Sequence, residues 1–248
     1  MRKICVSLSK GGVAKSTSAV SLAHGLSMKG KKTLLIDSDD QGQAAYLLGV
    51  NPEVGLANVL HEEIEAKEAI YKARDNLYIL AGDKTLSGTK RSIGRKDFGA
   101  EQTLSNALAS VEGKFDFVII DTSPSWDTLT INSVFYCNEI LIPVSLEVLS
   151  LNSLSEFLRR LNQVLHFKQP NQFDHKITIL PTFSDGRVKK SKEILDILET
   201  HYAKMLLSPI RYCSRISESA AFGQTIFEYA PHSRGAEDYS KIITAVMK

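Results

Sequence analysis

The sequence predicts an α/β protein with a doubly wound, mostly parallel sheet flanked by helices, for two reasons. Six short runs rich in Val, Ile and Leu are apolar throughout, which is typical of strands buried on both faces of a parallel sheet. Amphipathic stretches separate these runs, so strands and helices alternate along the chain. A chain of 248 residues, 43% of them hydrophobic, can bury a sizeable core. We expect one domain over residues 1–248.

The elements can be assigned in chain order. Strands are expected at ICVSLS (4–9), KTLLID (32–37), LYILAG (77–82), FDFVIID (115–121), EILIPVS (139–145) and KITILPT (176–182). Helices are expected over 16–29, about 98–112, 150–166, 189–203 and 234–247. The least regular part is 50–97, where the basic, glycine-containing stretch SGTKRSIGRKDFG (87–99) indicates a surface loop.

Composition excludes several classes of protein. Thirty basic and 28 acidic residues leave a net charge of +2, so binding to nucleic acid would need a local basic patch. Cys5, Cys137 and Cys213 lack metal-type spacing, and we expect buried thiols in a reducing compartment. The apolar run at the N-terminus ends at Lys10, too short for a signal segment or a membrane span. We therefore expect a cytoplasmic protein that does not bind membranes.

The stretch SKGGVAKST (9–17) has the parts of a phosphate-binding loop. Gly11 and Gly12 let backbone N–H groups turn toward phosphate oxygens, and Lys15 can reach the outer phosphates. Ser16 offers a hydroxyl to magnesium where a helix begins, and a helix N-terminus favours anions. The alternative is an ordinary glycine-rich turn between a strand and a helix.

Two residues break the strict pattern GxxxxGK[ST], because Ser9 and Ala14 stand where it has glycines. Ala14 costs little if its φ is negative, since only a positive φ penalises its Cβ. On that condition the loop can still hold phosphate.

Acidic residues end two other apolar runs. FDFVIID ends in Asp121, which in a Walker B arrangement holds magnesium directly or through water. KTLLIDSDD carries Asp37, Asp39 and Asp40, which can hold metal-bound water or orient an attacking water. Helix capping is the alternative for each of them. Because the carboxyl ends of parallel strands share one edge of a sheet, we expect all three segments to meet there.

Five segments in order resemble the ParA/MinD family of deviant Walker-box ATPases, most nearly its ParA (Soj-like) branch. The resemblance covers nearly the whole chain and is weakest over 50–97. The five segments are KGGVAKST, TLLIDSDDQGQAAYLLG, FDFVIIDTSPS, LTINSVFYCNEILIPVS and SRISESAAFGQTIFEYAPHSRGAEDY. The resemblance implies the P-loop NTPase fold with a deviant Walker A loop.

The resemblance implies a role for each matching residue. Lys10 corresponds to the family's signature lysine, which reaches the phosphates of the other subunit in an ATP-bound sandwich dimer. Lys15 would hold the β and γ phosphates, and Asp39 would position the attacking water. Magnesium would be held by Ser16, Asp37 and Asp121. The ATP-binding set would be Lys10, Gly11, Gly12, Val13, Ala14, Lys15, Ser16 and Thr17.

Three departures from the family pattern follow from the same alignment. Asp40 replaces a proline, and the extra charge could slow hydrolysis or shift metal binding. The turn after Asp121 keeps Pro124 but reads TSPS. Ile210–Cys213 stands where relatives carry an amide that helps recognise adenine, so base contacts are less secure than phosphate contacts.

Basic residues in two segments are candidates for DNA contacts. By the resemblance, Arg187 and Arg215 fall where Soj-like proteins carry DNA-contacting arginines, and Lys189 and Lys190 lie beside Arg187 around an expected helix start. A solvated helix face is an equal alternative for the lysines. No base-reading helix is evident, so DNA binding would ignore sequence.

The resemblance implies an ATPase whose ATP-bound homodimer binds DNA on the nucleoid until a ParB-like adaptor stimulates slow hydrolysis, which segregates a plasmid or chromosome. A ParA-like ATPase that positions a protein cargo is an alternative, and a MinD-like membrane switch is a weaker one. The latter needs an amphipathic C-terminal helix, whereas EDYSKIITAVMK is expected to pack on the domain. The other candidates are an iron-protein reductase, an amidoligase or kinase, and a nucleotide-binding scaffold with negligible hydrolysis.

Overall fold

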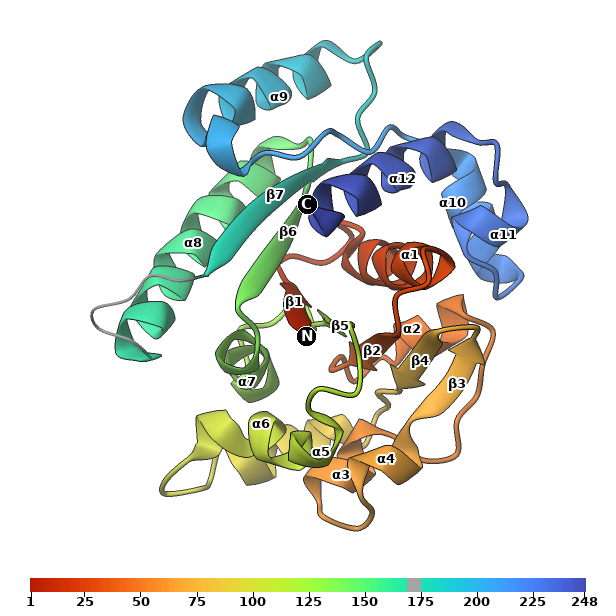
Figure 1. Ribbon diagram of the computed structural model, residues 1–248. Coiled ribbons are helices and arrows are strands. Elements are labelled where there is room, and N and C mark those ends of the chain that lie inside the picture. The colour runs from red at the N-terminus through yellow and green to blue at the C-terminus, as the bar shows by residue number, and fades with distance from the viewer. Residues whose placement is uncertain (169–174) are drawn as a thin grey trace.

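The computed structural model describes residues 1–168 and 175–248, which form a seven-stranded sheet in the order β3-β4-β2-β5-β1-β6-β7 (Figure 1). Neighbouring strands are parallel except for β3, which pairs antiparallel with β4 at one edge. The expected mostly parallel, doubly wound sheet is thus confirmed. Its strands are β1 (Arg2–Val6), β2 (Thr33–Asp37), β3 (Tyr71–Arg74), β4 (Leu77–Leu80), β5 (Phe117–Asp121), β6 (Glu139–Ser145) and β7 (Lys176–Thr182).

Helices cover both faces of the sheet and enclose two apolar cores. One face carries α1 (Lys15–Met28), α2 (Gln43–Leu47), α10 (Ser214–Ala221), α11 (Ile226–Tyr229) and α12 (Arg234–Met247). The other carries α3 (Leu56–Leu60), α4 (Ala66–Ala69), α5 (Leu86–Ile93), α6 (Thr103–Ala107), α7 (Thr128–Tyr136), α8 (Val148–Lys168) and α9 (Lys189–Tyr202). All six expected strands are present, and four of the five expected helices are found within two residues of their bounds.

The expected helix over 98–112 is found only in part, because its residues form three short helical segments, η1 (Ala100–Gln102), α6 (Thr103–Ala107) and η2 (Ala109–Val111), instead of one helix. The amide of Asn132, in α7, intervenes between Ala100 and Leu104. Its Nδ2 donates to the carbonyl of Ala100 at 2.9 Å, and its Oδ1 accepts from the N–H of Leu104 at 3.0 Å. These are the two groups that a continuous helix would join directly, so the insertion breaks it.

The expected loop over 87–99 is also wrong in its first half, where α5 forms. Leu86, Thr89 and Ile93 are buried at helical spacing on the core face, and the basic residues between them hide this pattern in the sequence. The region 50–97 as a whole folds into α3, α4, β3, β4 and α5.

The C-terminal helix α12 packs on α1, as expected. A Cβ on Gly25 of α1 would lie 1.9 Å from Ile243 Cδ1, so a larger residue there would force the Ile243 side chain to move. Tyr239, Ile242 and Val246 are buried on the same face of α12. The apolar face of this helix is therefore occupied by the protein's own core.

Within the described ranges, 1–168 and 175–248, every helix is too short or too polar to cross a lipid bilayer. Cys5 and Cys137 are buried, as expected, and burial raises the pKa of the Cys5 thiol. Cys213 is a correction, because it is only partly buried and lines a cavity described below.

Candidate functional site

The carboxyl ends of β1, β2 and β5 meet at one edge of the sheet. Asp121 at the end of β5 pairs in register with Val6 of β1 on one side and with Asp37 of β2 on the other. The loop 9–17 leaves β1 at the same edge and leads into α1. Three segments far apart in the sequence are therefore brought together, as the strand order predicts.

The loop 9–17 contains two residues in the left-handed backbone region. Gly12 has a φ of 71° and Ala14 a φ of 67°, next to the start of α1. The condition that made Ala14 tolerable, a negative φ, is not met. An L residue with a Cβ is strained in this region by about 1–2 kcal/mol. The loop therefore keeps the glycine conformation at Ala14 and stores strain there.

Two lysines point into or beside this loop. Lys15 is 7% exposed, and its Nζ donates to the carbonyl of Lys10 at 2.6 Å. Burial lowers the pKa of Lys15, and the charges of Asp121 and Asp39 partly oppose this shift. Lys10 Nζ contacts Glu147 Oε2 at 3.1 Å and Ser150 Oγ at 2.6 Å. Lys10 is thus held within its own chain, while Lys15 lies beside the carboxylates.

Asp37 and Asp121 are buried side by side. Burial raises the pKa of Asp37 to about 7, although backbone N–H groups of Ala44 and Asp39 oppose the rise. Burial and then the charge of Asp37 raise the pKa of Asp121. Among the residues that the structure describes, neither buried Asp121 carboxylate oxygen has a hydrogen bond of ordinary geometry, although the Ser16 hydroxyl lies close enough to lower the pKa of Asp121. A pair of acids held in this way is costly unless a cation joins it.

The residues present fit a hard divalent cation such as Mg²⁺. Among residues 1–168 and 175–248, no three or more His, Cys, Asp or Glu side chains gather as a complete metal cage. Mg²⁺ is usually held by one or two carboxylates together with water and substrate phosphates, so a full protein cage is not required. The Asp121 carboxylate, next to Ser16 at the start of α1, meets this requirement.

Asp39 lies at the open side of the same edge. It lines the cavity described below and is 7% exposed, and its Oδ1 accepts from the N–H of Gln41 at 3.1 Å. Burial raises the pKa of Asp39. Asp40 turns away toward α5, where Ser87 Oγ donates to its Oδ2 at 2.8 Å, and hydrogen bonds from Gln41 and Ser87 lower its pKa. The charge of Asp40 is thus engaged by α5 and not by the cavity.

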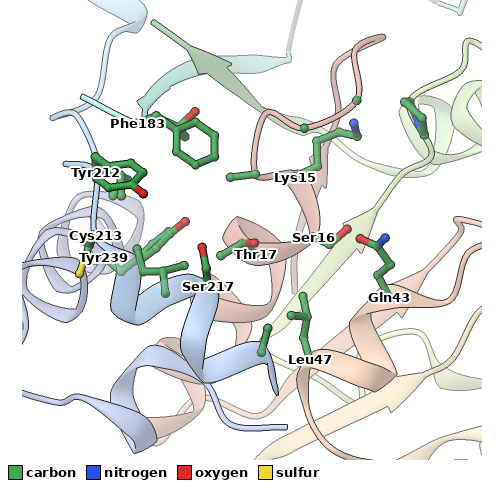
Figure 2. Close-up of a pocket in the computed structure, with 18 of the residues that line it drawn as sticks. Lys15, Ser16, Thr17, Gln43, Leu47, Phe183, Tyr212, Cys213, Ser217 and Tyr239 are labelled. Atoms are coloured by element: carbon green, nitrogen blue, oxygen red, sulfur yellow. The ribbon is translucent and has the colours of Figure 1, made fainter. Parts of the chain in front are cut away.

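A cavity of about 380 Å³ extends from the loop 9–17 to the C-terminal segment (Figure 2). Lys15 and Ser16 lie toward one end, and the rings of Phe183 and Tyr212 lie at the other. The bridge between Ser184 and Arg211 places the segment after Leu206 beside the end of β7. Additional lining residues, which the sequence did not single out, are Gln41, Gln43, Leu47, Thr182, Ile216, Ser217, Ala220 and Tyr239.

The aromatic end of the cavity has an unusual backbone. Phe183 has a φ of 56°, and it is 43% exposed, while Tyr212 is 50% exposed. Arg211 points back to Asp238 at 2.8 Å and Glu237 at 2.7 Å, and these acids raise its pKa. Ile210–Cys213 therefore contribute the ring of Tyr212 and an ion-paired guanidinium to this end of the cavity. The positive φ of Phe183 marks this end of the cavity as a candidate functional site, and the sequence does not reveal that φ.

The candidate DNA-contacting residues are all on the surface, each on or beside a helix. Arg187 pairs with Asp185 at 2.7 Å, Arg215 with Glu218 at 2.9 Å, and Lys189 with Glu193 at 3.6 Å. Lys190 is exposed in the first turn of α9. Surface pairs such as these contribute about 0–1 kcal/mol, so they can open for another anion.

Comparisons with known proteins place the chain in a family. A family model described as an AAA domain matches residues 1–173. The chain is 32% identical to the chromosome-partitioning ATPase Soj of Thermus thermophilus over 100% of its own length and 96% of the relative's. It is 31% identical to the sporulation initiation inhibitor protein Soj of Bacillus subtilis, over 95% of its own length and 94% of the relative's.

Solved structures agree. The chain is 29% identical to cobyrinic acid a,c-diamide synthase from Mycobacterium smegmatis with a bound ATP analogue and magnesium (TM-score 0.84; 100% and 94% of the two chains covered). It is 25% identical to a putative plasmid partition protein of Borrelia burgdorferi bound to AMPPNP (TM-score 0.80; 99% and 98% covered). With the geometry of the loop 9–17 and the strand ends beside it, these likenesses show that the chain belongs to the ParA/MinD family of P-loop ATPases.

Proposed function

We propose that residues 1–248 act as one ATP-dependent partition or positioning ATPase. In the proposed cycle an ATP-bound homodimer binds DNA without sequence preference and is released when hydrolysis is stimulated by a ParB-like adaptor. The observation that carries the proposal is the pair of buried acids, Asp37 and Asp121, facing the lysine-bearing loop 9–17. Buried charge of both signs at one strand edge suits a magnesium-bound triphosphate.

The phosphate-binding residues would be Gly11, Gly12, Lys15, Ser16 and Thr17, which line the cavity beside the start of α1. Their N–H groups and the N-terminus of α1 would face the phosphates, and Val13 and Ala14 would give the loop its shape. Lys15 would exchange the carbonyl of Lys10 for phosphate oxygens. The ammonium is already desolvated there, so its attraction to an anion is strong.

Asp37, Asp121 and Ser16 would hold the magnesium ion, which when bound neutralises charge on the β and γ phosphates. Asp39, at the open side of the cavity, would orient the attacking water with its carboxylate. Hydrolysis is expected to be slow until a partner completes the arrangement.

Lys10 is proposed to act across the dimer. In this chain its pairing with Glu147 is at the surface, where Glu147 is 69% exposed, so the contact can be broken at a cost of about 0–1 kcal/mol. A released Lys10 can then reach the phosphates of the second subunit, where an extra ammonium neutralises charge that develops during transfer. This would tie dimer formation to the presence of ATP.

Arg187, Lys189, Lys190 and Arg215 are the proposed DNA contacts on the nucleoid. Their acidic neighbours reduce the positive charge of one subunit, so tight binding would require the joined surfaces of two. Because phosphate neutralisation supplies the affinity, binding is expected to fall steeply with salt. The cargo would be a plasmid, a chromosome or a protein assembly. A membrane switch is disfavoured because α12 uses its apolar face inside the protein.

A second candidate activity is ATP-dependent amide formation. It is favoured by the likeness to the Mycobacterium smegmatis synthase at 29% identity. Both activities consume ATP, so ATP consumption alone does not separate them. Phosphate release without any carboxylic acid substrate, increased by DNA and an adaptor, would support the partition ATPase. Phosphate release that requires an acid and an amine donor would support the ligase.

The proposal is tested by co-sedimentation with DNA in ATP, ADP or no nucleotide, together with phosphate release. Wild type should sediment with DNA only in ATP. Lys10→Ala and Arg215→Ala should lose this binding, while Asp39→Ala should keep it and stop releasing phosphate. Equal binding in all three nucleotide conditions, or tight DNA binding by monomeric Lys10→Ala, would contradict the dimer cycle.

A further inference from the structure

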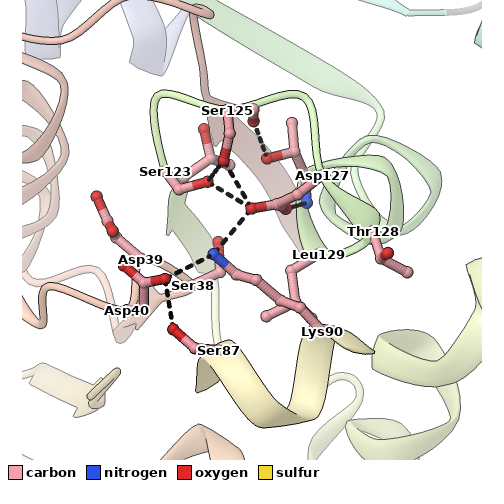
Figure 3. A network of polar contacts seen from close by, with 12 residues as sticks. Ser38, Asp39, Asp40, Ser87, Lys90, Ser123, Ser125, Asp127, Thr128 and Leu129 are labelled. Atoms are coloured by element: carbon pink, nitrogen blue, oxygen red, sulfur yellow. Dashed lines mark hydrogen bonds and ion pairs between the residues drawn. The ribbon is translucent and has the colours of Figure 1, made fainter. Parts of the chain in front are cut away.

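Lys90 in α5 lies between two acidic residues from loops that are distant in the sequence (Figure 3). Its Nζ is 2.8 Å from Asp127 Oδ2 and 3.6 Å from Asp40 Oδ2. The side chain of Lys90 is 12% exposed, that of Asp127 20% and that of Asp40 28%. This cluster, Asp40–Lys90–Asp127, is largely removed from solvent, unlike the surface pairs of α8 and α9.

The remaining polar groups of the cluster are satisfied. Asp127 Oδ2 accepts from Ser123 Oγ at 2.8 Å and from Ser125 Oγ at 2.9 Å, while its Oδ1 accepts from the N–H of Thr130 at 2.9 Å. Asp40 Oδ2 also accepts from Ser87 Oγ at 2.8 Å. A partly buried network whose members are all paired holds its backbone in one arrangement.

The two acids belong to the loops that carry the proposed chemistry. Asp40 directly follows Asp39, and Asp127 lies three residues after Pro124, which lines the nucleotide cavity. The first loop leaves β2 and the second leaves β5, next to Asp37 and Asp121 respectively. Lys90 therefore joins both loops to a third element, α5, from outside the cavity. Lys90 does not line the cavity itself.

We propose that Lys90 is a positioning residue for ATP hydrolysis, which fixes the loop of Asp39 against the loop after β5 by bridging Asp40 and Asp127. This inference rests on the proposed ATPase function. Displacement of a water-orienting carboxylate by about 1 Å can cost 100-fold in rate, while ground-state binding of the phosphates depends on other residues. In this view Asp40 is the attachment point of the loop.

The test compares Lys90→Met, which keeps the apolar stem and removes the ammonium, with Arg91→Met at an exposed position of the same helix. Lys90→Met should lower kcat at least tenfold and change the Kd for Mg·ATP less than threefold, and Lys90→Arg should recover most of kcat. Arg91→Met should match wild type. In the protein without nucleotide, amide hydrogen exchange of residues 38–42 should rise at least fivefold in Lys90→Met.

Asp40→Asn is the second variant, and it is used in case Lys90→Met folds poorly. It weakens the contact of Lys90 with Asp40 and leaves the contact with Asp127 intact. Like Lys90→Met, it should raise amide hydrogen exchange over residues 38–42 and lower kcat. A purely structural role predicts a lower Tm with kcat unchanged. Unchanged exchange and kcat in both variants would overturn the positioning role. Wild type that releases no phosphate would instead overturn the proposed function, while the exchange measurement still judges the bridge.

Discussion

The two ends of the proposed nucleotide cavity are built differently. The phosphate end consists of short loops after β1, β2 and β5, and its acids and lysine are buried with charges only partly compensated. The aromatic end is formed by Phe183 and Tyr212, which are about half exposed and come from the end of β7 and the segment before α10. The phosphate end therefore suits a charged group of a ligand, and the aromatic end offers a flat apolar surface.

The difference teaches where binding free energy is concentrated. Charged groups in a low-dielectric site interact strongly with an anion and are costly when it is missing. Half-exposed rings gain roughly 0.5–1.5 kcal/mol per stacked contact and are indifferent to which base they contact. We therefore expect changes at the phosphate end to affect binding more than changes at the aromatic end.

The largest effect is expected for Lys15→Ala. Loss of a desolvated ammonium should weaken Mg·ATP binding roughly 100-fold, about 3 kcal/mol. Titration of a fluorescent ATP analogue measures this loss. Lys29→Ala, at an exposed position just after α1, is the control and should bind like wild type. A loss of Mg·ATP affinity below tenfold for Lys15→Ala would contradict the expectation that the phosphate end contributes more binding free energy than the aromatic end.

Asp121→Asn sharpens the comparison through pH. Burial raises the pKa of Asp121 well above its ordinary value and that of Asp37 to about 7. Acids with raised pKa values stabilise the fold below the unfolded pKa, about 4, and lose this contribution as pH rises through the folded value. The unfolding free energy of the variant minus that of wild type, without ligand, should therefore rise by about 1–3 kcal/mol from pH 4.5 to 8.

Chemical denaturation across that pH range measures the difference. Asp75→Asn provides the control, because the Asp75 side chain is 97% exposed, and its difference from wild type should stay flat. If the difference in unfolding free energy between Asp121→Asn and wild type also stays flat with pH, ionisation of the buried acids does not destabilise the fold. The contrast between the two ends of the cavity would then fail.

At the aromatic end, Phe183→Ala and Tyr212→Ala should each weaken ATP binding about three- to tenfold, roughly 1 kcal/mol. GTP binding should weaken by the same factor, since stacking does not read the edge of a base. The same titration with both nucleotides tests this. Tyr71→Ala changes an exposed ring on β3, outside the cavity, and should alter neither affinity. A loss specific to ATP would show that these residues recognise adenine.

The smallest effect is expected for Ala14→Gly. Relief of the positive φ should stabilise the protein by about 0.5–1 kcal/mol after the greater unfolded-state entropy of glycine is subtracted. Thermal unfolding without ligand measures it. Ala245→Gly, inside α12, should destabilise by a similar amount because helical φ suits alanine. Destabilisation by both changes would mean that Ala14 is not strained.

Most of the sheet could be predicted from the sequence because strands buried on both faces need continuous apolar runs, and six such runs are present. The edge strand β3 was missed, since YKAR is polar and half exposed. The helix α5 was missed because Lys90 and Arg91 interrupt its apolar pattern. The break before α6 depends on Asn132, 28 residues away along the chain, which no local pattern can reveal.

The sequence by itself determined which residues form the proposed phosphate end, because backbone turns, a lysine and acids at strand ends have fixed local spacing. Only the tertiary structure shows three further features: Ala14 adopts a positive φ, Asp40 turns toward Lys90, and Phe183 and Tyr212 line the same cavity. The last two bring together segments tens of residues apart. Such contacts arise only when the sheet order brings the segments together, and local propensity does not encode that order.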